Sequence, residues 1–131
     1  MTHKMEKFDK LSEELLSIVR TIGEPLEGNC VTYHQSTDIA PQLVTKRDNI
    51  FSVGELAKSR ILEIGFNAGH SASLLLLASQ KTNASLTIVD IGEHAYMKPC
   101  YDRVSAEFPD RTRLFIGDSR DKLAELVARG E

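Results

Sequence analysis

Apolar residues in the first part of the chain recur every three or four positions. The pattern runs from Met5 to Ile22 and includes Leu11 and Leu15. This spacing places the apolar side chains on one face of an α-helix, and Gly23 is a helix stop signal. The sequence therefore predicts an amphipathic helix that ends near Gly23 and packs its apolar face against the rest of the protein.

A segment with weak periodicity follows this helix. Residues 23–41 are rich in Gly, Pro, Asn and Ser, which is typical of an irregular connection. A second helix is predicted over residues 48–58, where Asp48 or Asn49 would cap the N-terminus. Four apolar residues of this helix are expected to face inward: Ile50, Val53, Leu56 and Ala57. We assign residues 1–42 to an N-terminal helical arm with an irregular segment.

Three units of a strand followed by a helix are predicted in the rest of the chain. The strands are expected at residues 60–64, 86–90 and 113–116, and the helices at 71–81, 95–108 and 119–129. Successive strands start about 26 residues apart, which is the length of a crossover unit in a parallel sheet. The strands are short apolar runs, as expected when helices cover both faces of the sheet. Residues 43–131 are therefore predicted to form an α/β domain, a Rossmann-like parallel sheet with flanking helices.

Composition and charge narrow the class of protein. The 131 residues are 41% hydrophobic and 27% charged, which fits one small globular domain. The net charge of −3 and the scattered basic residues argue against a broad cationic surface for nucleic acid. The N-terminus is polar, and the longest aliphatic run, residues 74–78, is too short to cross a bilayer. We therefore expect a cytoplasmic protein that binds neither nucleic acid nor membranes.

Neither the cysteines nor the histidines have the spacing of a metal site. Cys30 and Cys100 lie 70 positions apart, so we expect two reduced thiols rather than a disulfide or a zinc site. Glu93, His94 and Cys100 lie in one segment, but no pair of them has a firm metal-ligand spacing, so a solvated loop that leads into a helix explains the segment better. His70 is interpreted as a polar surface residue at a helix start. The sequence predicts no metal ligands.

The loops that follow the three strands are predicted to form one binding site, because ligands of parallel sheets bind at the carboxyl ends of the strands. The first loop lies in EIGFNAG, where Gly65 allows a tight turn and Gly69 allows close approach of backbone and ligand. The second strand ends at Asp90, and Asp118 follows the third strand, where it also fits the pattern of a helix cap. Each strand end therefore offers a polar group to one crevice.

The chemistry of these loops indicates a positively charged nucleoside cofactor. Asp90 lies 25 positions after Gly65, near the spacing at which an acidic residue accepts hydrogen bonds from ribose hydroxyls. A dinucleotide-binding loop has three glycines, of which only two can be matched here. Glu63 beside the turn would repel a phosphate and attract an ammonium or sulfonium group. The loop is therefore predicted to bind a cation.

Three segments, ILEIGFNAGHSA, TIVDIGEH and RLFIGDSR, resemble in order and spacing the first three motifs of class I S-adenosylmethionine-dependent methyltransferases. The best match is the small-molecule O-methyltransferase-like branch. The resemblance covers residues 43–131 and implies S-adenosylmethionine as cofactor, S-adenosylhomocysteine as product and a small molecule as methyl acceptor. It also implies a partial class I methyltransferase fold of about three strands.

The resemblance gives each matched residue a role. Glu63 would lie near the methionyl ammonium, and Ser71 would hold the methionyl carboxylate at a helix N-terminus. The loop under the methionine part would comprise Gly65, Phe66, Asn67 and Gly69. The nucleoside would be contacted by Asp90 at the ribose hydroxyls, by Ile91 at the adenine face, and by Asp118 with Ser119 at the adenine edge.

The resemblance also defines what the sequence leaves open. In the family, catalytic and metal-binding residues commonly follow a fourth strand that pairs beside the first, and this sequence ends after the third unit. No catalytic residue is therefore assigned, and a divalent metal stays open. The uncovered first strand, residues 61–64, predicts a homo-oligomer or a domain swap. Two alternatives remain: a non-catalytic module that binds the cofactor or a partner chain, and an NAD(P)-dependent oxidoreductase.

Overall fold

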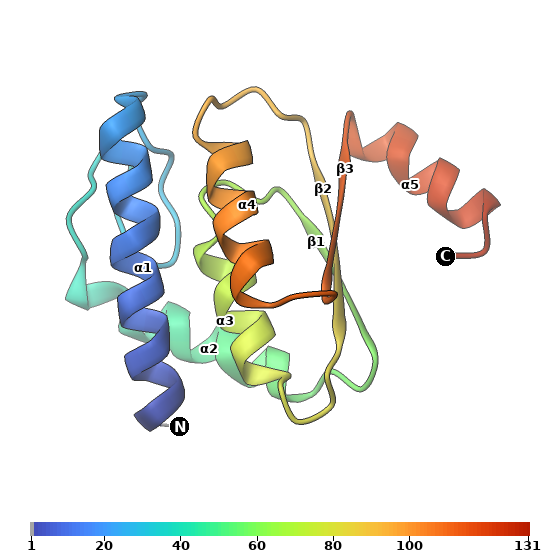
Figure 1. Ribbon diagram of the computed structural model, residues 1–131, viewed down its shortest axis with the longest axis horizontal. Helices are drawn as coiled ribbons and strands as arrows, with labels where there is room; N and C mark the ends of the chain where they lie inside the picture. The colour runs from blue at the N-terminus through green and yellow to red at the C-terminus, as the bar shows by residue number, and fades with distance from the viewer. Residues whose placement is uncertain (1) are drawn as a thin grey trace.

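The computed structural model describes residues 2–131, which form alternating helices and strands around one sheet (Figure 1). The elements in chain order are α1 (Thr2–Ile22), a short 3-10 helix η1 (Pro41–Leu43), α2 (Val44–Glu55), β1 (Arg60–Ile64), α3 (His70–Ala78), β2 (Ser85–Asp90), α4 (Met97–Glu107), β3 (Thr112–Ile116) and α5 (Ser119–Ala128). None of the helices in residues 2–131 is both long and apolar enough to cross a membrane.

The three strands form a parallel sheet in the order β1-β2-β3. Glu63 of β1 pairs with Ile88 of β2, and Ile88 pairs in turn with Leu114 of β3. A helix connects each strand to the next, as a parallel arrangement requires. The predicted α/β architecture of a parallel sheet with flanking helices is therefore confirmed.

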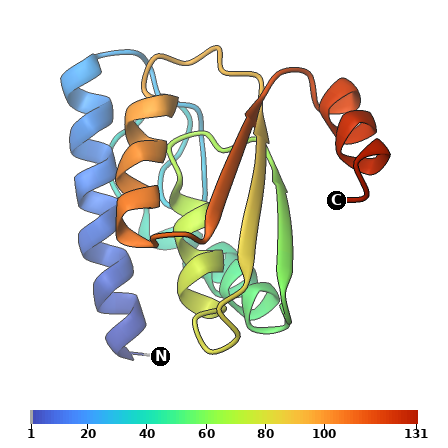
Figure 2. The ribbon, with the colours of Figure 1, turned by 45° about the vertical axis from the view of Figure 1, so that its right-hand side comes forward.

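Most of the hydrophobic core lies on one side of this sheet, where Figure 2 shows α1, α3 and α4. Helix α3 is buried along nearly its whole length because it packs against β2, α1 and α2. The core joins Phe8 and Leu15 of α1 with Leu74 of α3 and Leu86 of β2. The N-terminal arm therefore shares its core with the α/β segment.

The other side of the sheet carries only α5 among the described residues (Figures 1 and 2). The predicted covering of both faces is therefore wrong for β1, where Leu62 and Ile64 are each 51% exposed. A groove of about 280 Å³ lies between the sheet and α5, and Leu126 is the buried residue of that helix. Because β1 pairs only with β2 within residues 2–131, one edge of β1 is left without a partner strand.

Helix α2 presents to the core a face that only partly matches the one predicted. It begins at Val44, and its N-cap position is Leu43 rather than Asp48 or Asn49. Its buried residues are Phe51 and Gly54. Of the four residues predicted to face inward, Ile50 and Ala57 are partly buried, whereas Val53 and Leu56 are exposed. The reason is a close helix contact, because a Cβ atom at Gly54 would lie 2.7 Å from the Cβ of Ala78. A glycine at a helix interface carries no apolar signal in the sequence.

Candidate functional site

A cavity of about 500 Å³ lies at the carboxyl ends of the three strands. Its volume is within the range of sites that bind small molecules and cofactors. The three predicted loops all contribute to it, with Gly65, Phe66, Asn67, Ser71, Asp90, Ile91, Asp118 and Ser119 in its lining. Two residues of the predicted site, Glu63 and Gly69, do not line this cavity.

The first loop turns sharply from β1 into α3 by using left-handed backbone conformations. The φ angles are +83° at Gly65, +56° at Asn67 and +91° at Gly69. Gly69 is required for packing, because a Cβ atom there would lie 2.5 Å from the ring of Phe66. The absent side chain at Gly69 therefore makes room for Phe66, while Gly65, Phe66 and Asn67 face the ligand space.

Asp90 connects the second loop to the first. Its Oδ2 atom accepts hydrogen bonds from the backbone N–H of Phe66 at 2.7 Å and of Asn67 at 3.4 Å. Its Oδ1 atom accepts one from the N–H of Gly92 at 2.7 Å. A carboxylate has about four acceptor positions, so Asp90 can still accept a hydrogen bond from a ligand hydroxyl. The same side chain thus fixes both loops and faces the cavity.

Glu63 lies on β1 outside the cavity lining, and its Oε1 atom is buried without a hydrogen-bond partner within residues 2–131. Burial raises the pKa of Glu63 to about 8, and the negative charge of Asp90 adds to the effect. The carboxyl group is therefore mostly protonated at pH 7. This state differs from the anionic carboxylate on which the predicted attraction for a cation was based.

Asp118 caps α5 and lines the cavity as well. Its Oδ1 atom accepts a hydrogen bond from the N–H of Arg120 at 2.8 Å, which confirms the helix-cap interpretation. The pKa of Asp118 is lowered, first by the side chain of Arg120 and then by this backbone hydrogen bond. The carboxylate therefore stays ionised over a wide pH range.

The N-terminal segment contributes residues that the sequence did not predict: Glu27, Gly28, Asn29 and Cys30 line the cavity. Asn67 holds this segment in place, because its Nδ2 donates to the carbonyls of Glu27 at 3.2 Å and Gly28 at 3.4 Å. The hydroxyl of Tyr96 in turn donates to Oδ1 of Asn67 at 3.0 Å. Irregular segments have no periodicity that would indicate which loop they contact, so no signal in the sequence places this segment.

His70 is a further residue of the cavity lining, and its prediction as a surface residue is wrong. It is 1% exposed, because it lies in the first turn of α3 under the packed core. Neither ring nitrogen makes a well-formed hydrogen bond within residues 2–131. Burial lowers the pKa of His70 to about 4, and a weak interaction with the backbone of Ser12 partly opposes this. The imidazole is therefore neutral at pH 7.

The thiols of the chain are not activated. Cys30 and Cys100 are both free thiols, as expected, and both are buried. Burial raises the pKa of the Cys30 thiol, although a hydrogen bond from Ser71 partly opposes it, and burial raises the pKa of Cys100 to about 12. Cys30 therefore lines the cavity as an uncharged group, without the thiolate that a nucleophile needs.

Negative charge predominates in the cavity lining. Four carboxylates, Glu27, Asp90, Glu93 and Asp118, line it together with one lysine, Lys46. A ligand that carries several phosphate charges would be repelled by this set, whereas a ligand with positive charge would be attracted. The lining therefore carries net negative charge, to which Glu63 does not contribute.

A comparison of the chain with protein-family models found no matching family, and a comparison with curated proteins found no match. The geometry and the charge of the cavity therefore carry the functional proposal.

Proposed function

We propose that this chain forms the cofactor-binding part of a class I S-adenosylmethionine-dependent methyltransferase that acts on a small molecule. The observation that carries the proposal is the position and charge of the cavity. It lies at the carboxyl ends of the parallel strands, and residues of all three resembling motifs line it.

The charge of the cavity favours S-adenosylmethionine over a dinucleotide. S-Adenosylmethionine carries a sulfonium and an ammonium group against one carboxylate, whereas a nicotinamide dinucleotide carries a negative pyrophosphate. The lining has four carboxylates and one lysine, so it would stabilise the first ligand and destabilise the second. This difference argues against the oxidoreductase alternative.

The residues of the second and third loops fit the nucleoside part of the cofactor. Three backbone N–H groups donate to Asp90, which leaves about one acceptor position for a ribose hydroxyl. Ile91 lines the cavity and is 59% exposed, so a flat apolar ring such as adenine would cover an unburied side chain. Asp118 and Ser119 lie beside it in the lining and would reach the polar edge of the ring.

The N-terminus of α3 fits the methionyl part. The hydroxyl of Ser71 has only a weak contact with the sulfur of Cys30, at 3.7 Å, so it is free to donate to a carboxylate at the positive end of the helix. Glu63 would meet the methionyl ammonium only after its side chain moves, because it does not line the cavity. When bound, the cofactor supplies an electrophilic methyl group, and the role of these residues is to bind and orient it.

The direct test is a calorimetric titration of the 131-residue chain with S-adenosylhomocysteine. The informative variant is Ile91→Ala, because the backbone hydrogen bonds of Asp90 make an Asp90 variant liable to disturb the loop. Removing the Ile91 contact with adenine should weaken binding by about 1–2 kcal/mol, or about 5- to 30-fold in Kd. The matched control is Ile39→Ala, which removes an equally large, partly exposed side chain outside the cavity and should leave Kd unchanged.

Equal binding by the parent chain and the Ile91→Ala chain would contradict the assigned site, as would a folded chain that binds no S-adenosylhomocysteine. Tighter binding of NADH than of S-adenosylhomocysteine would support the oxidoreductase instead. Transfer of a labelled methyl group to a panel of catechols, sugars and amines then separates an enzyme from a non-catalytic binding module.

A further inference from the structure

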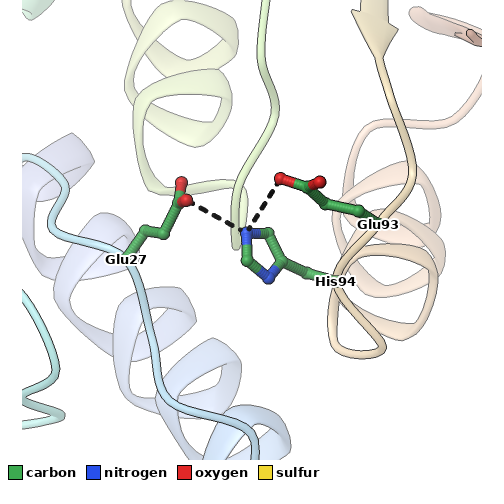
Figure 3. A group of neighbouring side chains, drawn as sticks. All are labelled: Glu27, Glu93 and His94. Atoms are coloured by element: carbon green, nitrogen blue, oxygen red, sulfur yellow. Dashed lines mark ion pairs between the residues drawn. The ribbon is translucent and has the colours of Figure 1, made fainter.

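Three potential metal ligands meet at the cavity although they are separated in the sequence. Glu27 comes from the irregular N-terminal segment, and Glu93 and His94 come from the loop after β2. One ligand atom from each residue lies within 4.8 Å of the others. Nε2 of His94 is 3.2 Å from Oε1 of Glu27 and 3.9 Å from Oε1 of Glu93. Figure 3 shows both carboxylates directed at this one ring nitrogen.

A further carboxylate sets the orientation of the His94 ring. Nδ1 of His94 faces Oε2 of Glu24 at 3.5 Å, and the same oxygen accepts a hydrogen bond from the N–H of Ala95 at 2.8 Å. The ring is also stacked on Tyr96, with centroids 4.9 Å apart and planes inclined by 9°. With a metal ion on Nε2, the carboxylate of Glu24 would accept the remaining ring proton on Nδ1, which is the usual arrangement of a metal-binding histidine.

In this tautomer the lone pair of Nε2 points toward two negative carboxylates. That arrangement is repulsive unless a cation or a proton lies between the three groups. Nε2 is buried and has no hydrogen-bond partner within residues 2–131, since its approach to Glu27 lacks hydrogen-bond geometry. The cluster therefore has an acceptor nitrogen and two anionic oxygens directed at one point beside a cavity.

We propose that Glu27, Glu93 and His94 bind a divalent transition-metal ion of the Zn²⁺ type. Bonds of about 2.0–2.1 Å to a tetrahedral Zn²⁺ place neighbouring ligand atoms about 3.3 Å apart. Nε2 of His94 lies 3.2 Å from Glu27, and the exposed side chain of Glu93, at 3.9 Å, would move closer to the ion on binding. An imidazole ligand favours Zn²⁺ over Mg²⁺ and Ca²⁺, which prefer oxygen ligands alone. Three protein ligands leave the fourth position to water or to a ligand in the cavity.

The ion has a structural consequence that is independent of the proposed methyltransferase function. It joins the N-terminal segment, through Glu27, to the loop after β2, through Glu93 and His94. The direct connections between these regions are otherwise hydrogen bonds of single side chains: Glu24 accepts from the N–H of Ala95, and the hydroxyl of Tyr96 accepts from the N–H of Glu27. The ion therefore holds the N-terminal segment over the cavity, and the lining stays negative overall, because four carboxylates then face one lysine and one divalent ion.

The test is a calorimetric titration of the full chain with Zn²⁺, repeated with Glu27→Gln and Glu93→Gln. Both side chains are more than half exposed, so the amides keep the shape of the side chains and should leave the fold intact, which circular dichroism checks. We expect one Zn²⁺ per chain and a loss of affinity of at least about 10- to 100-fold in each variant. The matched control is His3→Gln, which removes an exposed histidine beside Glu6 and should leave the affinity unchanged.

Two further measurements distinguish this site from other zinc-binding groups of the chain. Glu24→Gln, which leaves all three ligands in place, should weaken binding by about 10- to 100-fold if it orients His94. Co²⁺ should give the visible absorption of a tetrahedral nitrogen and oxygen site, and Mg²⁺ should not displace it. The proposal is overturned if both glutamate variants bind Zn²⁺ as the parent does, if no Zn²⁺ binds, or if nitrogen NMR shows a proton on Nε2 of His94 in the presence of Zn²⁺.

Discussion

Glu63→Gln should remove a large pH dependence from the stability of this fold. The Oε1 atom of Glu63 is buried without a hydrogen-bond partner within residues 2–131. Burial, together with repulsion from the Asp90 carboxylate, raises the pKa of Glu63 from 4.5 to about 8. The folded chain therefore keeps a proton on Glu63 at pH values at which the unfolded chain has released it.

Proton linkage gives the direction and the size of the effect. Because the pKa is higher in the folded state, the stabilisation is complete below pH 4.5 and is lost as the pH rises to about 8. Each unit between the two pKa values lowers the free energy of unfolding by about 1.4 kcal/mol. The total loss is therefore about 5 kcal/mol. This is a large part of the roughly 5–15 kcal/mol that stabilises a typical domain.

The assay is urea denaturation of the parent and of Glu63→Gln at a series of pH values from about 5 to about 9. The glutamine amide does not ionise, so its burial changes the free energy of unfolding by the same amount at every pH. The parent should lose stability relative to the variant as the pH rises. The control is Glu55→Gln, an exposed residue at the end of α2, whose profile should run parallel to that of the parent.

Parallel profiles of the parent and Glu63→Gln would refute this reasoning. They would mean that water or a neighbouring group stabilises the ionised carboxylate in the folded state. An NMR titration of the Glu63 carboxyl carbon gives a second, direct check, because its midpoint should lie near 8 and not near 4.5.

Two further predictions concern packing and association. Gly54→Ala should lower the free energy of unfolding by about 1–3 kcal/mol, because the new Cβ would lie 2.7 Å from that of Ala78. The control Ser52→Ala, at an exposed position of the same helix, should have little effect. Equal or greater stability of Gly54→Ala in urea denaturation would contradict the close contact. The unpaired edge of β1 should make the parent chain associate as its concentration rises in sedimentation experiments. Leu62→Lys on β1 should reduce this association, whereas the control Val53→Lys on α2 should not. A parent that stays monomeric at every concentration would show that this edge does not pair.

The strands and the cavity loops could be predicted because their signals are local. β1 occupies the predicted residues, and β2 and β3 each start one residue earlier than predicted. Strand ends in a parallel sheet meet at one edge, so the convergence of Gly65, Asp90 and Asp118 followed from the chain order alone. What binds in the cavity stays a prediction.

Features that depend on contacts between distant segments could not be predicted. The surface assignment of His70 failed because α1 packs against α3 and His70 is buried. A buried histidine and an exposed histidine at a helix start have the same local sequence pattern. The burial that shifts the pKa values of His70 and Glu63 is likewise a property of the packed fold. Periodicity indicates that a residue is on a helix face, but it does not identify which neighbour covers that face.

The sequence by itself determined the alternation of strands and helices, the glycine turn after β1 and the polar residues at the strand ends, because each depends on residues a few positions apart. Only the tertiary structure decided which sheet face stays open, which face of α2 is buried, and that Glu27 lies beside Glu93 and His94. The position of Glu27 depends on how the irregular N-terminal segment crosses the loops. That path is fixed by hydrogen bonds such as those of Asn67, between residues about 40 positions apart, which a local pattern does not encode.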